Sequence, residues 1–392
     1  MSARDVVVTG IGLVSSLGEG AGQHWNVLSA EGTRPTLEAE RFAPYVVHPL
    51  PVIDWNLQIA KRGDQRQMET WQRLGVYAAG LALDDADAKH DELLAAMDMI
   101  VAGGGGERDM AVDQAILDAA RTRNDRDLLL NEKLTTELRP TLFLAQLSNL
   151  LAGNISIVHK VTGSSRTFMG EEGCGIAAIE TAAARIRSGQ SRQVLVGSAF
   201  QTEHPDMLLG YELGGYLHRG PWKPVWQRDD SEGGGLVSGS GAAFLVLESR
   251  EHAEERGRKP YAAIGPVAAA RTNRANRELS EAVAELVASL GAPQDGVMIV
   301  SGASGVPEAT QAERQALDGA GAVRGFSSLT GHLKESQFPF AVALAALAVS
   351  HGAYYPAFDP ETEKATEGPL SATIATTVGH HRNEGAALVV PA

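Results

Sequence analysis

The stretch from Ser164 to Gly189 gathers residue types that could carry covalent chemistry. The only cysteine of the chain, Cys174, stands in a glycine-rich run that also holds Glu171 and Glu172. An alanine-rich segment with helical apolar spacing follows. Backbone N–H groups and the helix dipole converge at the start of a helix, where a nucleophile is readily activated. A cysteine enzyme is therefore one hypothesis, and a small buried side chain is the other.

The histidines offer acid–base or metal chemistry. His332 follows Thr330-Gly331, and it could be either a functional imidazole or a hydrogen-bonded core residue. His380 and His381 are adjacent, and neighbouring residues in a strand point to opposite faces. No acidic or histidine cluster accompanies this pair in the sequence, so we expect no metal site here.

The elements that position these residues follow from periodicity. Ile176, Ile179, Ala183 and Ile186 predict a helix that ends near Gly189. An apolar strand is predicted next, over residues 194–199.

The chain also repeats itself. A helix predicted over 68–86 leads to Met99-Ile100-Val101, and a helix over 279–290 leads to Met298-Ile299-Val300, 199 residues further on. A second alanine-rich helix, Phe338–His351, corresponds to the central one, and the repeated order of elements predicts two similar halves.

Composition narrows the class of protein. With 392 residues, 44% of them hydrophobic, the chain can bury a large core. A single cysteine excludes a disulfide framework and suits a reducing cytoplasm, and we expect neither a signal peptide nor a transmembrane segment. The net charge of −14 argues against nucleic acid as a partner.

Several motifs resemble those of the β-ketoacyl synthases of the thiolase fold. The opening, Val6–Gly18, is similar to their first strand and loop, and Ser327–His332 is similar to their Lys-Ser-x-Thr-Gly-His motif. The turn at 170–175 resembles their nucleophile elbow, usually Cys-Ala-(Ser/Thr)-Gly. In the register set by Gly175, Glu172 stands at the nucleophile's position and Cys174 at that of the Ser/Thr. A carboxylate there cannot carry an acyl thioester.

The same register shows what else is missing. Ketosynthases condense with a thiolate, two histidines and a lysine. The first histidine position falls on Gly302 and the lysine position on Ser327, while His332 is retained. The Gly-Phe-Gly-Gly oxyanion loop falls on residues 379–382, without its paired glycines. These losses together imply that condensation has been abandoned, so no catalytic residue, cofactor or metal is expected.

The resemblance implies an α/β fold, the five-layered α-β-α-β-α thiolase-like sandwich, with halves at residues 1–253 and 254–392. Within the family the sequence is most similar to chain-length factors, the ketosynthase β subunits of type II polyketide systems. Their turn commonly reads Gly-Glu-Gln-Ala-Gly-Gly. This implies a heterodimer with a catalytic ketosynthase, which would bring acyl carrier protein to the complex. An aryl polyene system is one pathway that fits.

The resemblance also implies how such a pair is built. Thiolase-fold subunits join their sheets edge to edge, and we expect the strand Gln193–Phe200 at that edge. The segment 107–149 is expected to cross the interface, with Leu142, Phe143 and Leu144 lining the partner's acyl tunnel.

Two other classes of function stay open. One is an enzyme: a malonyl-carrier-protein decarboxylase with Glu172 in the oxyanion site, or an acyltransferase that uses Cys174. The other is a homodimeric acyl-binding protein without a catalytic partner. Gly302 and Ser327 weigh against both enzymes, because the decarboxylating histidine and the lysine are missing.

Overall fold

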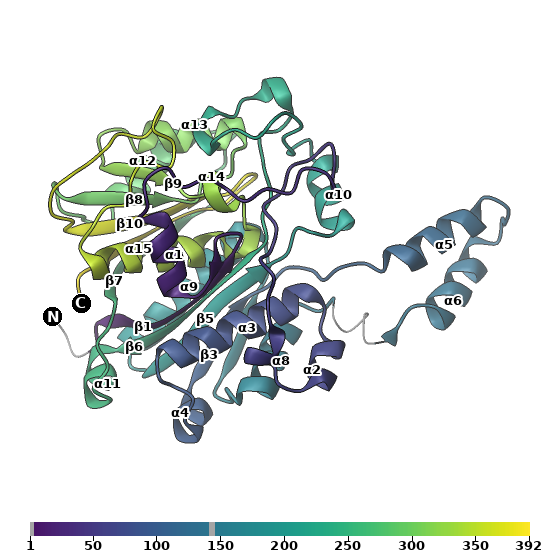
Figure 1. The fold of residues 1–392 in the computed structure, drawn as a ribbon, viewed down its shortest axis with the longest axis horizontal. Coiled ribbons are helices and arrows are strands. Elements are labelled where there is room, and N and C mark those ends of the chain that lie inside the picture. The colour runs from purple at the N-terminus through teal and green to yellow at the C-terminus, as the bar shows by residue number, and fades with distance from the viewer. Residues whose placement is uncertain (1–3, 141–145) are drawn as a thin grey trace.

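The structure is a computed structural model that describes residues 4–140 and 146–392 (Figure 1). Its strands are β1 (Val6–Ser15), β2 (Gly18–Glu19), β3 (Asp98–Ala102), β4 (Ser165–Phe168), β5 (Gln193–Phe200), β6 (Gly241–Ser249), β7 (Ala262–Ala270), β8 (Val297–Ser301), β9 (Ala322–Gly325), β10 (Ala372–Val378) and β11 (Glu384–Val390). Its longer helices are α1 (Ala21–Leu28), α3 (Thr70–Asp85), α5 (Met110–Ala120), α6 (Arg126–Thr136), α8 (Leu150–His159), α9 (Glu171–Arg187), α10 (Pro205–Leu213), α12 (Leu279–Ala288), α13 (Pro307–Ala316) and α15 (Gln337–His351). Its shorter ones are α2 (Arg62–Gln67), α4 (Asp91–Ala96), α11 (Arg250–Glu255), α14 (Ser327–Thr330) and the 3-10 turns at 55–57, 225–227, 230–232 and 334–336.

Strand order confirms the predicted duplication. Across the described residues the sheet runs β4-β3-β5-β6-β1-β7-β11-β10-β8-β9, with β2 beside β1. From the middle outward, β1-β6-β5-β3-β4 in one half matches β7-β11-β10-β8-β9 in the other. The directions match as well, because the two inner pairings of each half are antiparallel and the two outer pairings are parallel.

The helices complete a layered sandwich. α9 and α15 contact each other and the strands of both halves, and their apolar side chains share one core cluster. α3 and α8 cover the outer face of the first half, whereas α12 and α13 cover that of the second. The chain therefore has the thiolase-like α-β-α-β-α architecture that the sequence predicts.

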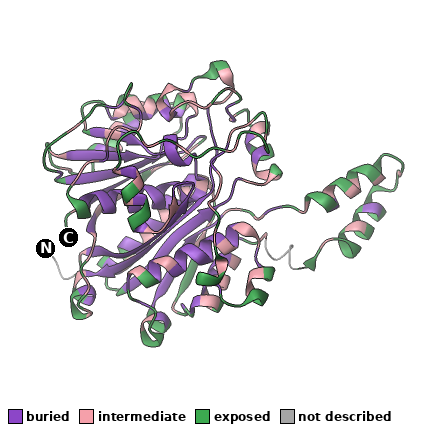
Figure 2. Cartoon of the chain, in the orientation of Figure 1, coloured by how far each residue is buried: buried purple, intermediate pink, exposed green. Residues whose placement is uncertain are grey.

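The two central helices differ in how far they are buried. Every residue of α15 from Gln337 to Val349 is buried, as its continuous apolar composition requires (Figure 2). α9 buries Ile176, Ile179 and Ile186 but exposes polar residues such as Glu180 in its C-terminal half.

The expectation that Gln193–Phe200 forms the free edge is wrong. This strand, β5, is hydrogen-bonded to β3 on one side and β6 on the other, and all of it is buried. The outer strand of the first half is β4, where Ser165 and Arg166 are exposed. Strand order depends on pairings between distant segments. The apolar composition of β5 therefore predicts that the strand is buried, but it does not predict which strands lie beside it.

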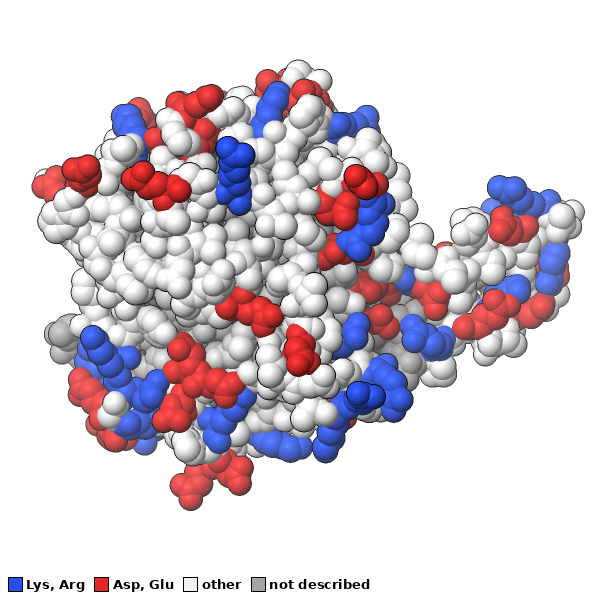
Figure 3. Space-filling view, viewed as in Figure 1, with Lys and Arg blue, Asp and Glu red and all other residues white. Residues whose placement is uncertain are grey.

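A two-helix arm, α5 and α6, projects from the body (Figure 1). Val112 and Leu129 are buried in it, and Arg123, in the turn between the two helices, bonds to Glu132 of α6. Leu117 and Leu128 are 68% and 65% exposed. The arm also carries charged side chains of both signs (Figure 3). The arm thus presents apolar side chains that the body of the chain does not cover.

Within the described part of the chain, no helix combines the length and apolar character needed to cross a membrane.

β1 and β7 pair directly, so the sheet runs across the junction of the halves. The division at residue 253 accordingly stays a prediction.

Candidate functional site

The turn into α9 sets the position of Glu172. The helix begins at Glu171, five residues before the predicted apolar repeat, so Glu172 lies in its first turn. Gly170 has φ 125° and Glu171 has φ 49°, both in the left-handed region. This backbone resembles the sharp turn expected at a nucleophile elbow, and it directs the Glu172 side chain into the protein interior.

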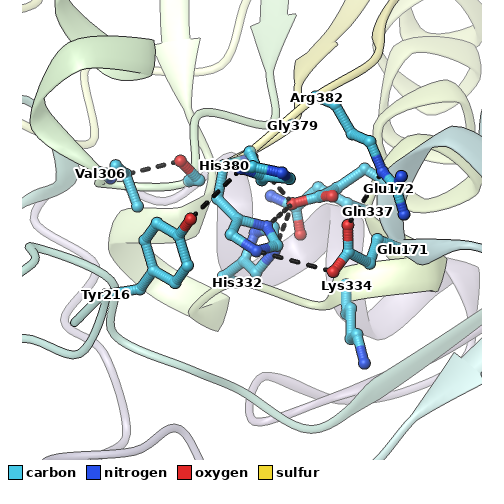
Figure 4. Close-up of polar contacts among 12 residues, drawn as sticks. Glu171, Glu172, Tyr216, Val306, His332, Lys334, Gln337, Gly379, His380 and Arg382 are labelled. Atoms are coloured by element: carbon cyan, nitrogen blue, oxygen red, sulfur yellow. Dashed lines mark hydrogen bonds and ion pairs between the residues drawn. The ribbon is translucent and has the colours of Figure 1, made fainter. Parts of the chain in front are cut away.

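Three segments meet at the Glu172 carboxylate (Figure 4). Its Oε1 accepts a hydrogen bond from the backbone N–H of His380 at 3.1 Å and lies 2.8 Å from Nδ1 of the same residue. Nε2 of His332 lies 2.9 Å from that oxygen. Glu172 and His332 are fully buried, and the His380 side chain is only 4% exposed. The structure thus joins the two residues that the sequence singled out, Glu172 and His332, and adds His380.

Electrostatics favour a charged pair in this cluster. Burial raises the pKa of Glu172, but His380 and His332 outweigh burial and hold that pKa well below its ordinary value. For His380, burial lowers the pKa, while Glu172 and then Glu171 raise it above its ordinary value of 6.5. Both shifts therefore favour the charged forms of the two groups, a Glu172 carboxylate facing a His380 imidazolium.

The histidine pair lies in a turn and not in a strand. His380 and His381 lie in the turn between β10 and β11, which Gly379 and Asn383 close with a hydrogen bond. Only His380 faces inward; His381 is exposed, 3.4 Å from the Tyr216 hydroxyl. The prediction that no acidic or histidine cluster lies near them was wrong, because the turn brings His380 to residues far away in sequence. The sequence signal for this was the oxyanion-loop register itself, which placed His380 beside the nucleophile's position.

Several bonding positions in the cluster are unused. Oε2 of Glu172 has no hydrogen-bond partner. Neither ring nitrogen of His332 makes a hydrogen bond, since Nε2 is close to Glu172 but not aligned with it for hydrogen bonding. Buried polar atoms are normally satisfied, so these positions call for an explanation.

Gln337 fills the space where the missing histidine and lysine are expected. A Cβ at Gly302 would come within 3.0 Å of Cγ of Gln337 and 2.7 Å of Oγ1 of Thr377. The Gln337 amide donates to Oγ of Ser327 at 2.8 Å and accepts from the Leu333 N–H at 2.6 Å. Both predicted degenerate positions, Gly302 and Ser327, therefore contact the first residue of α15.

Cys174 is in a poor setting for a nucleophile. It is 3% exposed, and its thiol donates to the Glu171 carbonyl at 2.9 Å. Burial raises the pKa of this thiol well above 9.0, and the nearby Glu335 and Glu172 raise it further. Thiol reactivity requires the thiolate and access to solvent, and this site disfavours both.

The predicted tunnel residues Leu142, Phe143 and Leu144 lie outside the described residues. The described chain resumes after them and reaches α8 at Leu150, and α8 packs against α3.

The family described as "Beta-ketoacyl synthase, N-terminal domain" matches residues 3–253. The chain belongs to the β-ketoacyl synthase family.

The 3-oxoacyl-[acyl-carrier-protein] synthase 2 of Vibrio cholerae is 28% identical over 67% of this chain and 62% of its own length. The tetracenomycin polyketide synthase ketoacyl synthase beta subunit of Streptomyces glaucescens is 29% identical over 50% of this chain and 51% of its own. The chain thus spans less than two thirds of the length of these ketosynthases.

Solved structures agree on the fold. The ishigamide ketosynthase/chain length factor superposes with a TM-score of 0.81 over 100% of both chains, at 20% sequence identity. A type II polyketide ketosynthase solved with its acyl-carrier protein and bound hexaketide gives 0.74 over 99% of this chain, at 18% identity. At such identities the likeness extends to the architecture alone.

Proposed function

We propose that this ketosynthase-like chain is a non-catalytic subunit of the chain-length-factor type, which pairs with an active ketosynthase in type II polyketide or related biosynthesis. One observation carries the proposal. At the position where a ketosynthase needs a thiol, the Glu172 carboxylate is buried and ion-paired, and its oxygen takes a backbone N–H of the oxyanion loop. A group that occupies this site from within leaves little room there for a thioester carbonyl.

The enzymatic alternatives have less support. Acyl transfer by Cys174 would need a thiolate, and burial of this thiol opposes its ionisation. Malonyl decarboxylation would need an imidazole at Gly302, where Gln337 and Thr377 leave no space for a side chain.

Two exposed features support pairing. The edge of β4 is exposed, which is how two sheets of this fold could join. The arm presents Leu117 and Leu128 beside the body, as a segment that contacts another subunit would. Relatives of this chain include a polyketide synthase beta subunit, and a matching structure carries the words ketosynthase/chain length factor in its name.

Co-expression with candidate ketosynthases, followed by size-exclusion chromatography and intact mass, tests the pairing. We expect a one-to-one complex with a cysteine-containing ketosynthase. A stable homodimer that forms no complex with any of the co-expressed ketosynthases would favour the acyl-binding alternative.

Activity assays test the absence of catalysis. With malonyl and acyl carrier proteins the chain alone should neither condense nor become acylated, and Glu172→Cys should not restore condensation. An acyl adduct on Cys174, or activity of that single variant, would contradict the proposal.

The tunnel role and the aryl polyene setting stay proposals. In an intact complex, Phe143→Ala should lengthen or broaden the products, whereas Leu142→Trp or Leu144→Trp should shorten them. Unchanged product lengths would reduce the chain to structural support of its partner.

A further inference from the structure

The cluster around Glu172 has the composition of a metal site. Among the described residues, ligand atoms of Glu172, His332 and His380 lie within 4.8 Å of one another, and all three residues are buried. They come from the start of α9, from the segment after α14 and from the β10–β11 turn. Segments so distant in sequence are held together by the sandwich, so the donors are positioned before any ligand arrives.

Two residues of the cluster have unused bonding capacity. Oε2 of Glu172 and both ring nitrogens of His332 lack hydrogen-bond partners, although both side chains are fully buried. An unpaired buried polar atom costs about 1–3 kcal/mol. A cation bound by the Glu172 carboxylate and Nε2 of His332 would give that nitrogen a partner.

Two of the three ligand spacings need little adjustment. The two imidazole nitrogens lie 2.8 Å and 2.9 Å from Oε1 of Glu172. Ligands about 2.0–2.1 Å from a tetrahedral zinc ion are about 3.3 Å apart, so each contact would open by about half an ångström.

The surroundings also support a cation. Nε2 of His380, the nitrogen turned away from the cluster, lies 3.8 Å from Oε1 of Glu171. A carboxylate behind a histidine ligand orients the ring and strengthens the metal bond. Lys334 and Arg382 bring positive charge nearby, but they lie 3.5 Å from Glu335 and 3.7 Å from Glu171 respectively.

We infer that Glu172, His332 and His380 form a binding site for a divalent transition-metal ion, and we assign zinc, which binds two imidazoles and a carboxylate tetrahedrally with one position open. Binding would release the proton held between Glu172 and His380, and the fourth position would be open to water or another ligand. The ion would fasten the start of α9 to the second half of the chain. This inference does not depend on the proposed function.

The test uses the full chain, freed of metal with a chelator and then titrated with Zn²⁺, Co²⁺ or, under nitrogen, Fe²⁺. We expect one equivalent of Zn²⁺ per chain, a Co²⁺ spectrum typical of tetrahedral nitrogen and oxygen ligands, and a rise in Tm that Mg²⁺ does not give. Tighter binding of Fe²⁺ than of Zn²⁺ would overturn the assignment to zinc.

Variants locate the site. His332→Gln and His380→Gln should each weaken Zn²⁺ binding at least 100-fold, whereas the adjacent, exposed His381→Gln should bind as the parent does. Equal loss in His381→Gln, or an unmodified chain with no tetrahedral Co²⁺ spectrum and no Tm shift, would overturn the inference. The spectrum of the unmodified chain decides the matter even if a variant fails to fold.

Discussion

The two halves end in equivalent strands that meet their surroundings differently. β4 closes the first half and β9 the second, each parallel to its inner neighbour. Most of β9 is buried, and Glu363 accepts a hydrogen bond from its Gly325 N–H at 2.7 Å. β4 is exposed or half-buried along its whole length.

The difference shows at which edge the sheet could pair with a strand of another chain. An edge covered by its own polypeptide is protected from pairing, whereas an exposed edge invites it. One sandwich therefore offers one covered end and one open end, and the arm extends from the half with the open end.

The largest effect on stability is expected from removing the Glu363 side chain, which bonds to β9. Glu363 accepts from the N–H groups of Gly325, Trp226 and Phe358. Glu363→Ala leaves three largely buried donors unpaired, so we expect a loss of about 3 kcal/mol of unfolding free energy, measured by denaturant titration. The exposed Glu367→Ala on the same segment should change it by less than about 0.5 kcal/mol. Equal midpoints for the two variants would show that the cover contributes nothing.

The next effect concerns the contact between the halves at Glu172, and it depends on pH. The pKa of His380 is raised, so its contribution is complete below its ordinary value of 6.5 and is lost as pH rises through the folded-state pKa. The pKa of Glu172 is lowered, so its contribution is present above its ordinary value of 4.5 and is lost as pH falls through its folded-state pKa.

With a chelator present to remove metal ions, His380→Gln should therefore lower the free energy of unfolding by about 1–3 kcal/mol near pH 5.5 and by progressively less toward pH 9. Denaturant titration at each pH measures this loss. His381→Gln is the matched control. A cost that stays constant across this range would contradict the ion pair.

A smaller effect sharpens the contrast between the edges. Ser164 and Phe168 turn their carbonyls toward β3, so by alternation Arg166 does as well, while the Thr167 N–H faces the open edge. Thr167→Pro should preserve the fold yet weaken ketosynthase binding at least about tenfold, or about 1.4 kcal/mol. Arg166→Pro should damage the β3 pairing and lower the Tm instead. Unchanged partner affinity in Thr167→Pro would place the interface elsewhere.

The smallest effect compares an outer helix with an inner one. A Cβ at Gly153 in α8 meets nothing closer than 3.9 Å, so Gly153→Ala should stabilise the chain by about 0.5–1 kcal/mol. A Cβ at Gly175 in α9 would come within 2.5 Å of the Glu335 carbonyl, so Gly175→Ala should destabilise it. Thermal unfolding measures both, and a shift of the same sign in each would refute the comparison.

Local patterns predicted most of the scaffold. The recurring Met-Ile-Val and the two alanine-rich helices lie in equivalent places because each half must bury the same helix faces. The motif register also identified Glu172 and His332 as neighbours. The place of β5, the cover over β9 and the inward turn of His380 depend on contacts between distant segments, which periodicity does not encode.

Gln337 opposes the return of a histidine at residue 302. Its side chain lies where a histidine at residue 302 would project, and its amide is bonded to Ser327 and Leu333. A lone Gly302→His change would overpack the interior, and removing Gln337 alone would open a void and strip two polar groups of their partner. Either change made alone should therefore lower the stability of the chain. For a chain of the proposed non-catalytic type, Gln337 would therefore oppose the return of a histidine at residue 302.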